Sequence, residues 1–323
     1  MKKLVPFLAL LIAAVLPSPS YAWVAQVPAA AASYTGDGDI AGTNFLAWYS
    51  CGLAYNAAYA TAGGKTCNVC TYIATVEANC TDLVASTNGT VTVPLLGGNS
   101  CSVVTCLVKI AYDQLGYATS GGNCGGSPCD ETNATPANQP VLTLSAQNGL
   151  PGITCTAANS TYLKSASTFS GTATQPFTVS WVAKFTGTAG AYNNVFGSRN
   201  GAPVDVETGF GNLANIIFGY AGAVLPVGFS TPDGSFYAVQ NILHGASPNS
   251  NTYVNGTGTP GSAGSSTLGT NFSVCADYDV AAAAFLTGVV LQWGVATGAW
   301  SVAGGSTSAL VNANQRSATH WNF

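Results

Sequence analysis

Hydrophobic and polar residues alternate in the stretch PFTVSWVAKF, which runs from Pro176 to Phe185. Its odd-numbered positions are apolar, and most of the even-numbered positions between them are polar. A repeat of two is typical of a β-strand, because successive side chains of a strand point to opposite faces of the sheet. The pattern therefore predicts a strand with one buried face, and it predicts that Trp181 on that face belongs to the core.

Similar strand-like segments follow toward the C-terminus, separated by Gly, Asn, Pro and Ser turns, and Asn255–Gly256 is a typical hairpin turn. Apart from an alanine run at 281–284 that could form a helical turn, nothing in this half indicates a helix. Many short strands with Gly-rich turns predict an all-β fold, a β-sandwich of the jelly-roll type. The segments are NIIFGY (215–220), SFYAVQNI (235–242), TYVNG (252–256) and FLTGVVLQWGV (285–295).

One carboxylate stands directly at the end of a strand-like segment, CLVKIAYDQLG, from Cys106 to Gly116. Asp113 and its neighbour Gln114 follow the alternating apolar residues without a gap. An Asp at a strand end commonly accepts backbone N–H groups and fixes a turn. We therefore expect Asp113 to be a structural residue.

The first 22 residues have the features of a secretory signal peptide. Lys2 and Lys3 precede an apolar run from Val5 to Leu16, and Ser20–Ala22 fits a small-x-small cleavage site. The run is shorter than the roughly 18 residues that a membrane span needs. We expect cleavage near Ala22 and a protein that is secreted, periplasmic or held at the cell surface, without a membrane span.

Charged residues are scarce, at 6% of the chain against roughly 25% in typical domains. Removal of Lys2 and Lys3 would leave six basic and twelve acidic residues, a formal charge of −6. Nothing in this composition attracts a phosphate backbone, so it disfavours a nucleic-acid partner. It also disfavours a helical bundle, whose exposed faces normally carry Lys and Glu.

Ten cysteines remain after the leader, an even number that in an exported chain predicts up to five disulfides. Cys67 and Cys70 have the spacing of half a zinc site, but no second pair accompanies them, so we expect disulfides and no metal. We expect one domain over 23–323, with a Cys-rich part (23–139) and the main jelly-roll strands (140–323). The cysteines are Cys51, Cys67, Cys70, Cys80, Cys101, Cys106, Cys124, Cys129, Cys155 and Cys275.

Several segments, taken in order, resemble the α-L-arabinofuranosidase B family, glycoside hydrolase family 54, whose catalytic domain is a concanavalin-A-like jelly roll. Tyr112–Gln114 matches the family's Tyr-Asp-Gln turn, whereas Leu115–Ala118 departs from the Ser-Gly-Asn-Gly that usually follows it. The segments are WYSCGLAYNAAYATAGGKTCNVC (48–70), CSVVTCLVKIAYDQLG (101–116), QPVLTL (139–144), STYLKS (160–165), QPFTVSWVAKF (175–185) and NANQRSATHWNF (312–323).

The resemblance implies release of arabinose by a retaining mechanism, which uses two carboxyl groups about 5–5.5 Å apart. By this comparison YAVQNILHG (237–245) matches the nucleophile segment, with Gln240 at the position of the carboxylate. The acid/base segment corresponds to 289–300, which has no Asp or Glu, and Asn194–Val195 stand where the family has adjacent cysteines. An amide cannot form the covalent glycosyl ester. The resemblance therefore implies a carbohydrate-active protein that has lost its catalytic carboxylates.

Other carboxylates offer an alternative if catalysis is retained. Asp205 and Glu207 lie two apart, so on a strand they would share a face, about 6–7 Å from each other. Asp233 in a Pro-Asp-Gly turn is a further fallback. Asp277 and Asp279 could bind a structural calcium ion, although a plain turn beside Cys275 explains them more simply.

Aromatic and amide side chains are candidates for binding a neutral glycan. Sugar rings stack on Trp or Tyr, while amides hydrogen-bond the hydroxyl groups. The candidates on or beside the late strand-like segments are Tyr220, Tyr237, Gln240, Asn241, Gln292, Trp293 and Trp300.

Three functions remain open at this point. The first is a secreted protein that binds arabinose-containing or other neutral glycans without hydrolysis. The second is an active α-L-arabinofuranosidase or related glycosidase with displaced carboxylates. The third is a surface adhesion or assembly protein built on a lectin-like jelly roll. The sequence leaves the oligomeric state open.

Overall fold

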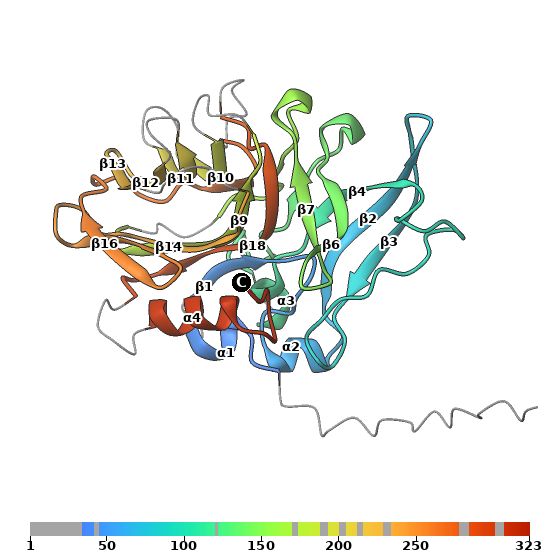
Figure 1. The fold of residues 1–323 in the computed structure, drawn as a ribbon, viewed down its shortest axis with the longest axis horizontal. Helices are drawn as coiled ribbons and strands as arrows, with labels where there is room; N and C mark the ends of the chain where they lie inside the picture. The colour runs from blue at the N-terminus through green and yellow to red at the C-terminus, as the bar shows by residue number, and fades with distance from the viewer. Residues whose placement is uncertain are drawn as a thin grey trace, which may run out of the picture. The chain divides into compact units, whose positions relative to one another are not determined.

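Eighteen antiparallel strands among the described residues form one continuous sheet in the computed structural model, and the sheet folds over into two facing layers (Figure 1). This confirms the predicted all-β sandwich. Residues 33–323 form one compact unit by their contacts, and the predicted signal peptide lies outside the described part. No described helix is both long and apolar enough to cross a bilayer. The structure describes residues 34–41, 45–119, 122–169, 174–187, 193–199, 205–211, 216–228, 234–277, 284–300 and 307–323.

The first layer is centred on the longest strand, β18, which pairs on one side with β9 and on the other with β1 and β7. β14 continues the layer beyond β9. In order, its strands are β1 (Phe45–Tyr49), β18 (Gly288–Thr297), β9 (Phe177–Phe185), β14 (Tyr237–Leu243), β15 (Ser250–Val254) and β16 (Thr257–Gly261). β7 (Leu150–Cys155) and β6 (Val141–Gln147) connect β18 to the second layer at β4.

The second layer contains the remaining ten strands among the described residues. In order, they are β13 (Val224–Gly228), β12 (Ile216–Tyr220), β11 (Asp205–Gly211), β10 (Asn193–Arg199), β17 (Asn271–Val274), β8 (Leu163–Ser165), β5 (Glu131–Thr132), β4 (Thr105–Ala111), β2 (Lys65–Ile73) and β3 (Val76–Val84). The helices are α1 (Asp37–Ala41), α2 (Ala57–Thr61), α3 (Gln114–Ala118) and α4 (Thr307–Arg316), with short 3₁₀ turns at Pro136–Asn138 and Ala157–Asn159.

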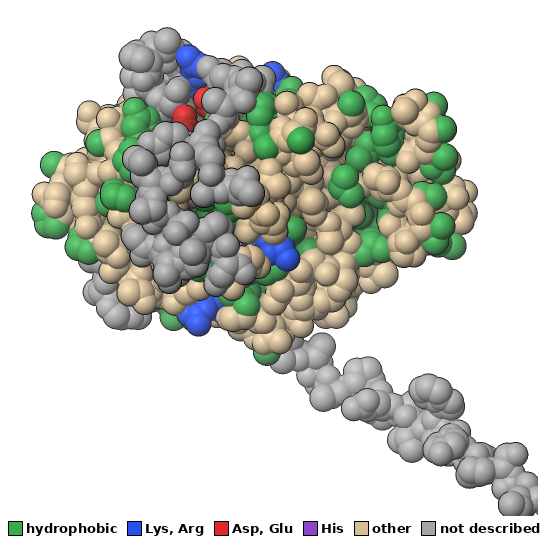
Figure 2. All heavy atoms as spheres, turned by 45° about the horizontal axis from the view of Figure 1, so that its top comes forward, with side chains coloured by type: hydrophobic (Ala, Val, Ile, Leu, Met, Phe, Trp, Pro, Cys, Tyr) green, Lys and Arg blue, Asp and Glu red, His purple; other side chains and the backbone are tan. Residues whose placement is uncertain are grey.

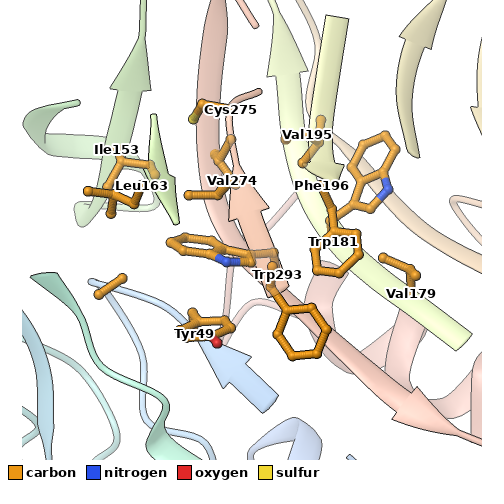
Figure 3. Packing of buried hydrophobic residues seen from close by; sticks show 14 of the residues in the cluster. Tyr49, Ile153, Leu163, Val179, Trp181, Val195, Phe196, Val274, Cys275 and Trp293 are labelled. Carbon is orange, nitrogen blue, oxygen red and sulfur yellow. The ribbon is translucent and has the colours of Figure 1, made fainter. Parts of the chain in front are cut away.

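Aromatic residues from both layers fill the space between them (Figure 3). Trp181 of β9 packs edge-on against Phe210 of β11, with ring centroids 5.3 Å apart. Trp293 of β18 stacks on Tyr49 of β1 at 5.3 Å. The apolar positions of β9 therefore face the core, as their alternation predicted, and Trp181 is a core residue.

Five disulfides pair all ten cysteines, which confirms the predicted disulfide framework. Four of them staple the part of the chain between Cys51 and Cys129, and the fifth joins β7 to the end of β17. Such cross-links stabilise segments that bury little apolar surface of their own. The pairs are Cys51–Cys67, Cys70–Cys80, Cys101–Cys106, Cys124–Cys129 and Cys155–Cys275.

Asp113 is the structural residue that the sequence predicted. Its carboxylate accepts the backbone N–H of Trp48 at 3.2 Å and that of Cys129 at 3.0 Å, and its own N–H donates to Asp130 at 2.9 Å. It thereby joins β1, the end of β4 and the loop before β5. Burial raises the pKa of Asp113 from 3.8 to about 6, although the backbone N–H groups partly offset that rise.

Helix α4 covers the face of the first layer that points away from the second layer, and nothing in the sequence had predicted it. Asn312 of α4 donates to Gln240 at 2.7 Å, and Gln240 in turn donates to Gln315 at 2.8 Å. All three side chains are fully buried. Gln240 therefore lies in a closed hydrogen-bond network under α4.

The same network ties the two ends of the described chain to β18. Asp37 of α1 accepts hydrogen bonds from Gln292 at 2.6 Å and from Gln315 at 2.8 Å. Gln292 accepts one from the indole N–H of Trp321 at 2.6 Å. Pairing of this kind offsets most of the free-energy cost of burying polar groups.

We predict that Gln240→Glu strongly destabilises the protein. The substitution removes the donor to Gln315 and puts a second carboxylate into a buried network that already contains Asp37, and an uncompensated buried charge costs about 3–5 kcal/mol. Urea unfolding monitored by tryptophan fluorescence measures the loss. Gln147→Glu, on the partly exposed strand β6, is the matched control and should change stability little. Equal stability of the two variants would contradict the closed network.

We predict that the stability contribution of Asp113 falls as pH rises. A carboxyl group whose pKa is higher in the folded chain makes folding take up a proton, so its contribution is complete below pH 3.8 and is lost as pH rises through 6. The full change is about 3 kcal/mol, because each pKa unit is about 1.4 kcal/mol. Unfolding free energies of wild type and Asp113→Asn at pH 4 and pH 7 measure it.

The Asn variant does not titrate, so its deficit relative to wild type should be larger at pH 4 than at pH 7. A deficit that is independent of pH would contradict the raised pKa.

Candidate active site on the outer face of the second layer

One row of side chains crosses the second layer on the face that points away from the sandwich core. The strand register places its members opposite one another, from β8 across β17, β10, β11 and β12 to β13. The members are Lys164, Ser273, Gly197, Glu207, Tyr220 and Val224.

Glu207 is the carboxylate at the centre of this row. Its neighbours Val206 and Thr208 are fully buried, and because strand side chains alternate, Glu207 points to the outer face. It is half-buried, between Gly197 on one side and Tyr220 on the other. Because Gly197 has no side chain, the neighbour of Glu207 on this side is the backbone of β10.

The turn after β17, which carries Asp277, folds back beside this face. The Ser273 hydroxyl donates to the carbonyl of Ala276 at 3.0 Å and lies 3.4 Å from that of Gly197. This bond holds Ala276, the neighbour of Asp277, beside Ser273. Ser273 and Glu207 lie two strands apart, about 10 Å between Cα atoms by strand spacing. The backbone of the turn that carries Asp277 therefore lies about two strands from Glu207.

Asn194 provides a buried amide next to these carboxylates. It lies opposite Gly209 on β11, two residues from Glu207 and on the same face, and it is fully buried. The backbone N–H of Cys275 donates to the carbonyl of Val195 at 3.1 Å, so Asn194 adjoins the turn that carries Asp277. Neither atom of its amide group has a hydrogen-bond partner among the described residues.

A bulge in β10 produces this arrangement. The register shifts between Asn194 and Phe196, and both Val195 and Phe196 turn into the core. Gly209 is required opposite the bulge, because a Cβ atom there would come within 2.2 Å of the Asn193 carbonyl. Bulges of this kind often redirect side chains beside functional sites.

The outer face carries both signs of charge. Arg199, opposite Asn271 and Asp205, lies two residues along β10 from Gly197, and Lys164 ends the row at β8. On the face of the molecule drawn in Figure 2, acidic and basic side chains lie close together. The face thus carries the Glu207 carboxylate and the Tyr220 ring, with the buried amide of Asn194 and the turn of Asp277 beside them.

Six of the seven predicted sugar-binding residues are buried, with 0 to 6% of their surface exposed. Trp293 stacks in the core and donates to Glu131 at 3.3 Å, and Trp300 packs edge-on against Phe45. These side chains fill the fold, so they offer no surface to a polysaccharide. The six are Tyr237, Gln240, Asn241, Gln292, Trp293 and Trp300, whereas Tyr220 is half-buried on the outer face.

Of the alternative carboxylates predicted from the sequence, Glu207 is the one whose side chain the structure describes on the outer face. Asp205 begins β11, opposite Arg199 in the strand register, but its side chain lies outside the described part of the structure. Asp233 and Asp279 also lie outside the described residues. A calcium ion at Asp277 and Asp279 remains a prediction.

Among the residues described, Cys70, Glu77 and Cys80 form one cluster with the composition of a metal site. Because Cys70 and Cys80 form a disulfide, the cluster offers no thiolate ligand.

No protein-family model and no curated protein matches this sequence. Solved structures do match. An arabinofuranosidase complexed with arabinofuranosyl-α-1,2-xylobiose superposes with a TM-score of 0.59 and 14% identity, over 88% of this chain and 65% of that one. The chain has the fold of this arabinofuranosidase.

Two further structures agree. A mutant of a glycoside hydrolase family 54 α-L-arabinofuranosidase, soaked with 4-nitrophenyl α-L-arabinofuranoside, gives a TM-score of 0.60 and 13% identity over 88% of this chain and 66% of that one. The family 54 enzyme soaked with a cyclic sulfate inhibitor superposes with a TM-score of 0.59 and 14% identity, over 88% of this chain and 66% of that one. The chain spans about two-thirds of the length of each. The resemblance stated from the order of sequence segments is therefore confirmed at the level of fold.

We predict that Asn194→Leu leaves the protein as stable as wild type or more so. Burial of an amide without partners costs about 1–3 kcal/mol, and an apolar side chain of similar size avoids that cost. Chemical denaturation measures the change. Asn312→Leu is the matched control and should be destabilised, because Asn312 donates to Gln240 and to the Ala238 carbonyl. Equal losses in the two variants would show that Asn194 has a structural role.

Proposed function

We propose that this chain is a glycoside hydrolase that cleaves arabinofuranosyl units from neutral polysaccharides at the outer face of β10, β11 and β17. The observation that carries the proposal is that Glu207 points to the outer face while the turn that carries Asp277 folds back beside the same face, two strands away. Hydrolysis of a glycosidic bond by a retaining or an inverting mechanism requires such a pair of carboxyl groups. The arabinofuranosyl ligands of the structurally similar proteins support the choice of sugar.

In this proposal Glu207 is the nucleophile and Asp277 the general acid and base. Glu207 is held on a strand with a neighbour on each side, which suits a group that must attack a fixed carbon atom. Asp277 gives a proton to the departing oxygen as the bond from the sugar to Glu207 forms. It then takes a proton from water, which releases the sugar and restores both groups.

The half-buried ring of Tyr220 borders the same face and would stack on the sugar, while the buried amide of Asn194 lies beneath it. Tyr220 is therefore the residue that favours glycan binding as such. Binding without hydrolysis is the second candidate function, and it uses the same face.

The hypothesis that catalytic carboxylates were lost depended on Gln240 and on residues 289–300. Gln240 is closed under α4, and most of this later segment forms strand β18, whose residues up to Ala296 are buried. Neither lies on the outer face of the second layer. We therefore propose retained carboxylates rather than lost ones. We also propose that the protein acts outside the cytoplasm, since five disulfides form and persist in oxidising compartments.

We predict that Glu207→Gln and Asp277→Asn each lower the kcat/KM for 4-nitrophenyl α-L-arabinofuranoside by at least about a hundredfold, the usual contribution of one acid or base. Release of nitrophenol measures activity, and circular dichroism verifies folding. Glu77→Gln is the matched control, because Glu77 pairs with Lys109 on another part of the sheet and should keep full activity.

Three outcomes separate the candidates. Loss of activity in both variants supports hydrolysis. A wild-type protein that binds arabinoxylan but releases no arabinose would replace hydrolysis by binding alone. Activity that survives in both variants would exclude this face as the catalytic site.

A further inference from the structure

A hollow of about 390 Å³ lies between α2, α3 and the start of β2. Figure 1 places these elements at the opposite end of the compact unit from β10–β13, so the hollow is separate from the outer face that carries Glu207. Its volume is in the range of small-ligand sites. We propose that this hollow is a second binding site, for one or two residues of a neutral polysaccharide chain.

An exposed tyrosine forms one wall of the hollow. Tyr117 of α3 has 41% of its surface exposed, which is unusual for a large aromatic side chain in this protein. Its hydroxyl donates to Asp130 at 2.9 Å, and its ring meets Tyr112 edge-on, with centroids 5.6 Å apart. The ring is therefore held in one orientation before any ligand arrives, so binding loses little side-chain entropy.

The opposite wall is also rigid and mostly uncharged. Tyr59 of α2 donates its hydroxyl to the Lys65 carbonyl at 2.6 Å, and its ring lies flat on Gly64, where a Cβ atom would come within 2.2 Å. The glycine leaves backbone groups at the surface of the hollow. The exposed ring of Tyr117 and the backbone around Gly64 form an apolar surface with a few polar groups, as sugar-binding sites do, and the buried ring of Tyr59 supports this surface.

The polar groups of the hollow favour a neutral ligand. The single cation in the lining, Lys65, is already paired with Asp82 at 2.8 Å. Asn56 uses its Oδ1 to cap α2 by accepting the Tyr59 N–H at 2.8 Å. Its amide N–H₂ group has no bond to the described part of the chain, so it can donate to a hydroxyl group.

The rim of the hollow allows a polymer to pass through it. Ala58, Ala62 and Ala118 are small and exposed. A sugar ring in the middle of a chain can stack on Tyr117 while its neighbours extend past these residues. A second site of this kind would hold the polysaccharide while the outer face engages its side branches.

The test measures binding in a chain that cannot hydrolyse its ligand. The double variant Glu207→Gln with Asp277→Asn serves as background, and affinity electrophoresis in gels with soluble arabinoxylan gives the dissociation constant. Addition of Tyr117→Ala should weaken binding about tenfold, by loss of stacking. Tyr117→Phe keeps the ring and should bind nearly as well as the background. Tyr72→Ala, a partly exposed tyrosine of β2 outside the hollow, is the matched control.

The result does not depend on the proposed hydrolysis, because retention is measured separately from nitrophenol release. Tyr117→Ala in the otherwise unchanged chain should leave hydrolysis of the small nitrophenyl substrate unaltered. Unchanged retention of the Tyr117→Ala variant, or no retention of the background protein, would overturn the second site. An equal loss in Tyr72→Ala would also overturn it, since the effect would then not come from the hollow.

Discussion

The structure depends on the burial of both faces of β18. One face places Trp293 in the core between the layers, and the other places Gln292 against Asp37 and Trp321. A buried amide without partners would cost about 1–3 kcal/mol, so Asp37 and Trp321 must stay in place beside Gln292. Because Asp37 and Trp321 lie near opposite ends of the described chain, the strand holds both ends against the sheet.

The same requirement explains why sequence patterns predicted the sandwich but not α4. The alternation in β9 identifies its core face, and Trp181 lies there. Ser180 on the other face is polar, yet it is buried and accepts a hydrogen bond from Gln315 of α4 at 3.1 Å. The helix packs through amide and hydroxyl side chains rather than through an apolar stripe. Hydrophobic periodicity detects helices by that stripe, so it could not detect this one.

The candidate site shows a similar limit. The spacing of Asp205 and Glu207 placed them on one face of a strand, and Glu207 does point away from the core. Nothing local in the sequence joins Glu207 to Asp277, because their proximity depends on the pairing of β10 with both β11 and β17. The amides and tryptophans chosen as sugar contacts have the composition of a binding site. Their burial follows from long-range packing, which composition does not reveal.

The scarcity of charge makes the location of the remaining carboxylates informative. The chain has twelve acidic residues. Seven of them bind backbone groups, buried amides, an indole N–H or lysines: Asp37, Asp39, Glu77, Asp82, Asp113, Asp130 and Glu131. Asp205 and Glu207 belong to β11, Asp277 follows β17, and Glu207 and Asp277 also have interactions within the structure.

Glu207 and the turn that carries Asp277 thus belong to two segments that the bulged strand β10 brings together. Like charges that are brought near each other repel, so in a chain that otherwise avoids charge this arrangement opposes folding. A fold that tolerates that cost at one face, beside a buried amide without partners, is typical of a site arranged for chemistry rather than for stability.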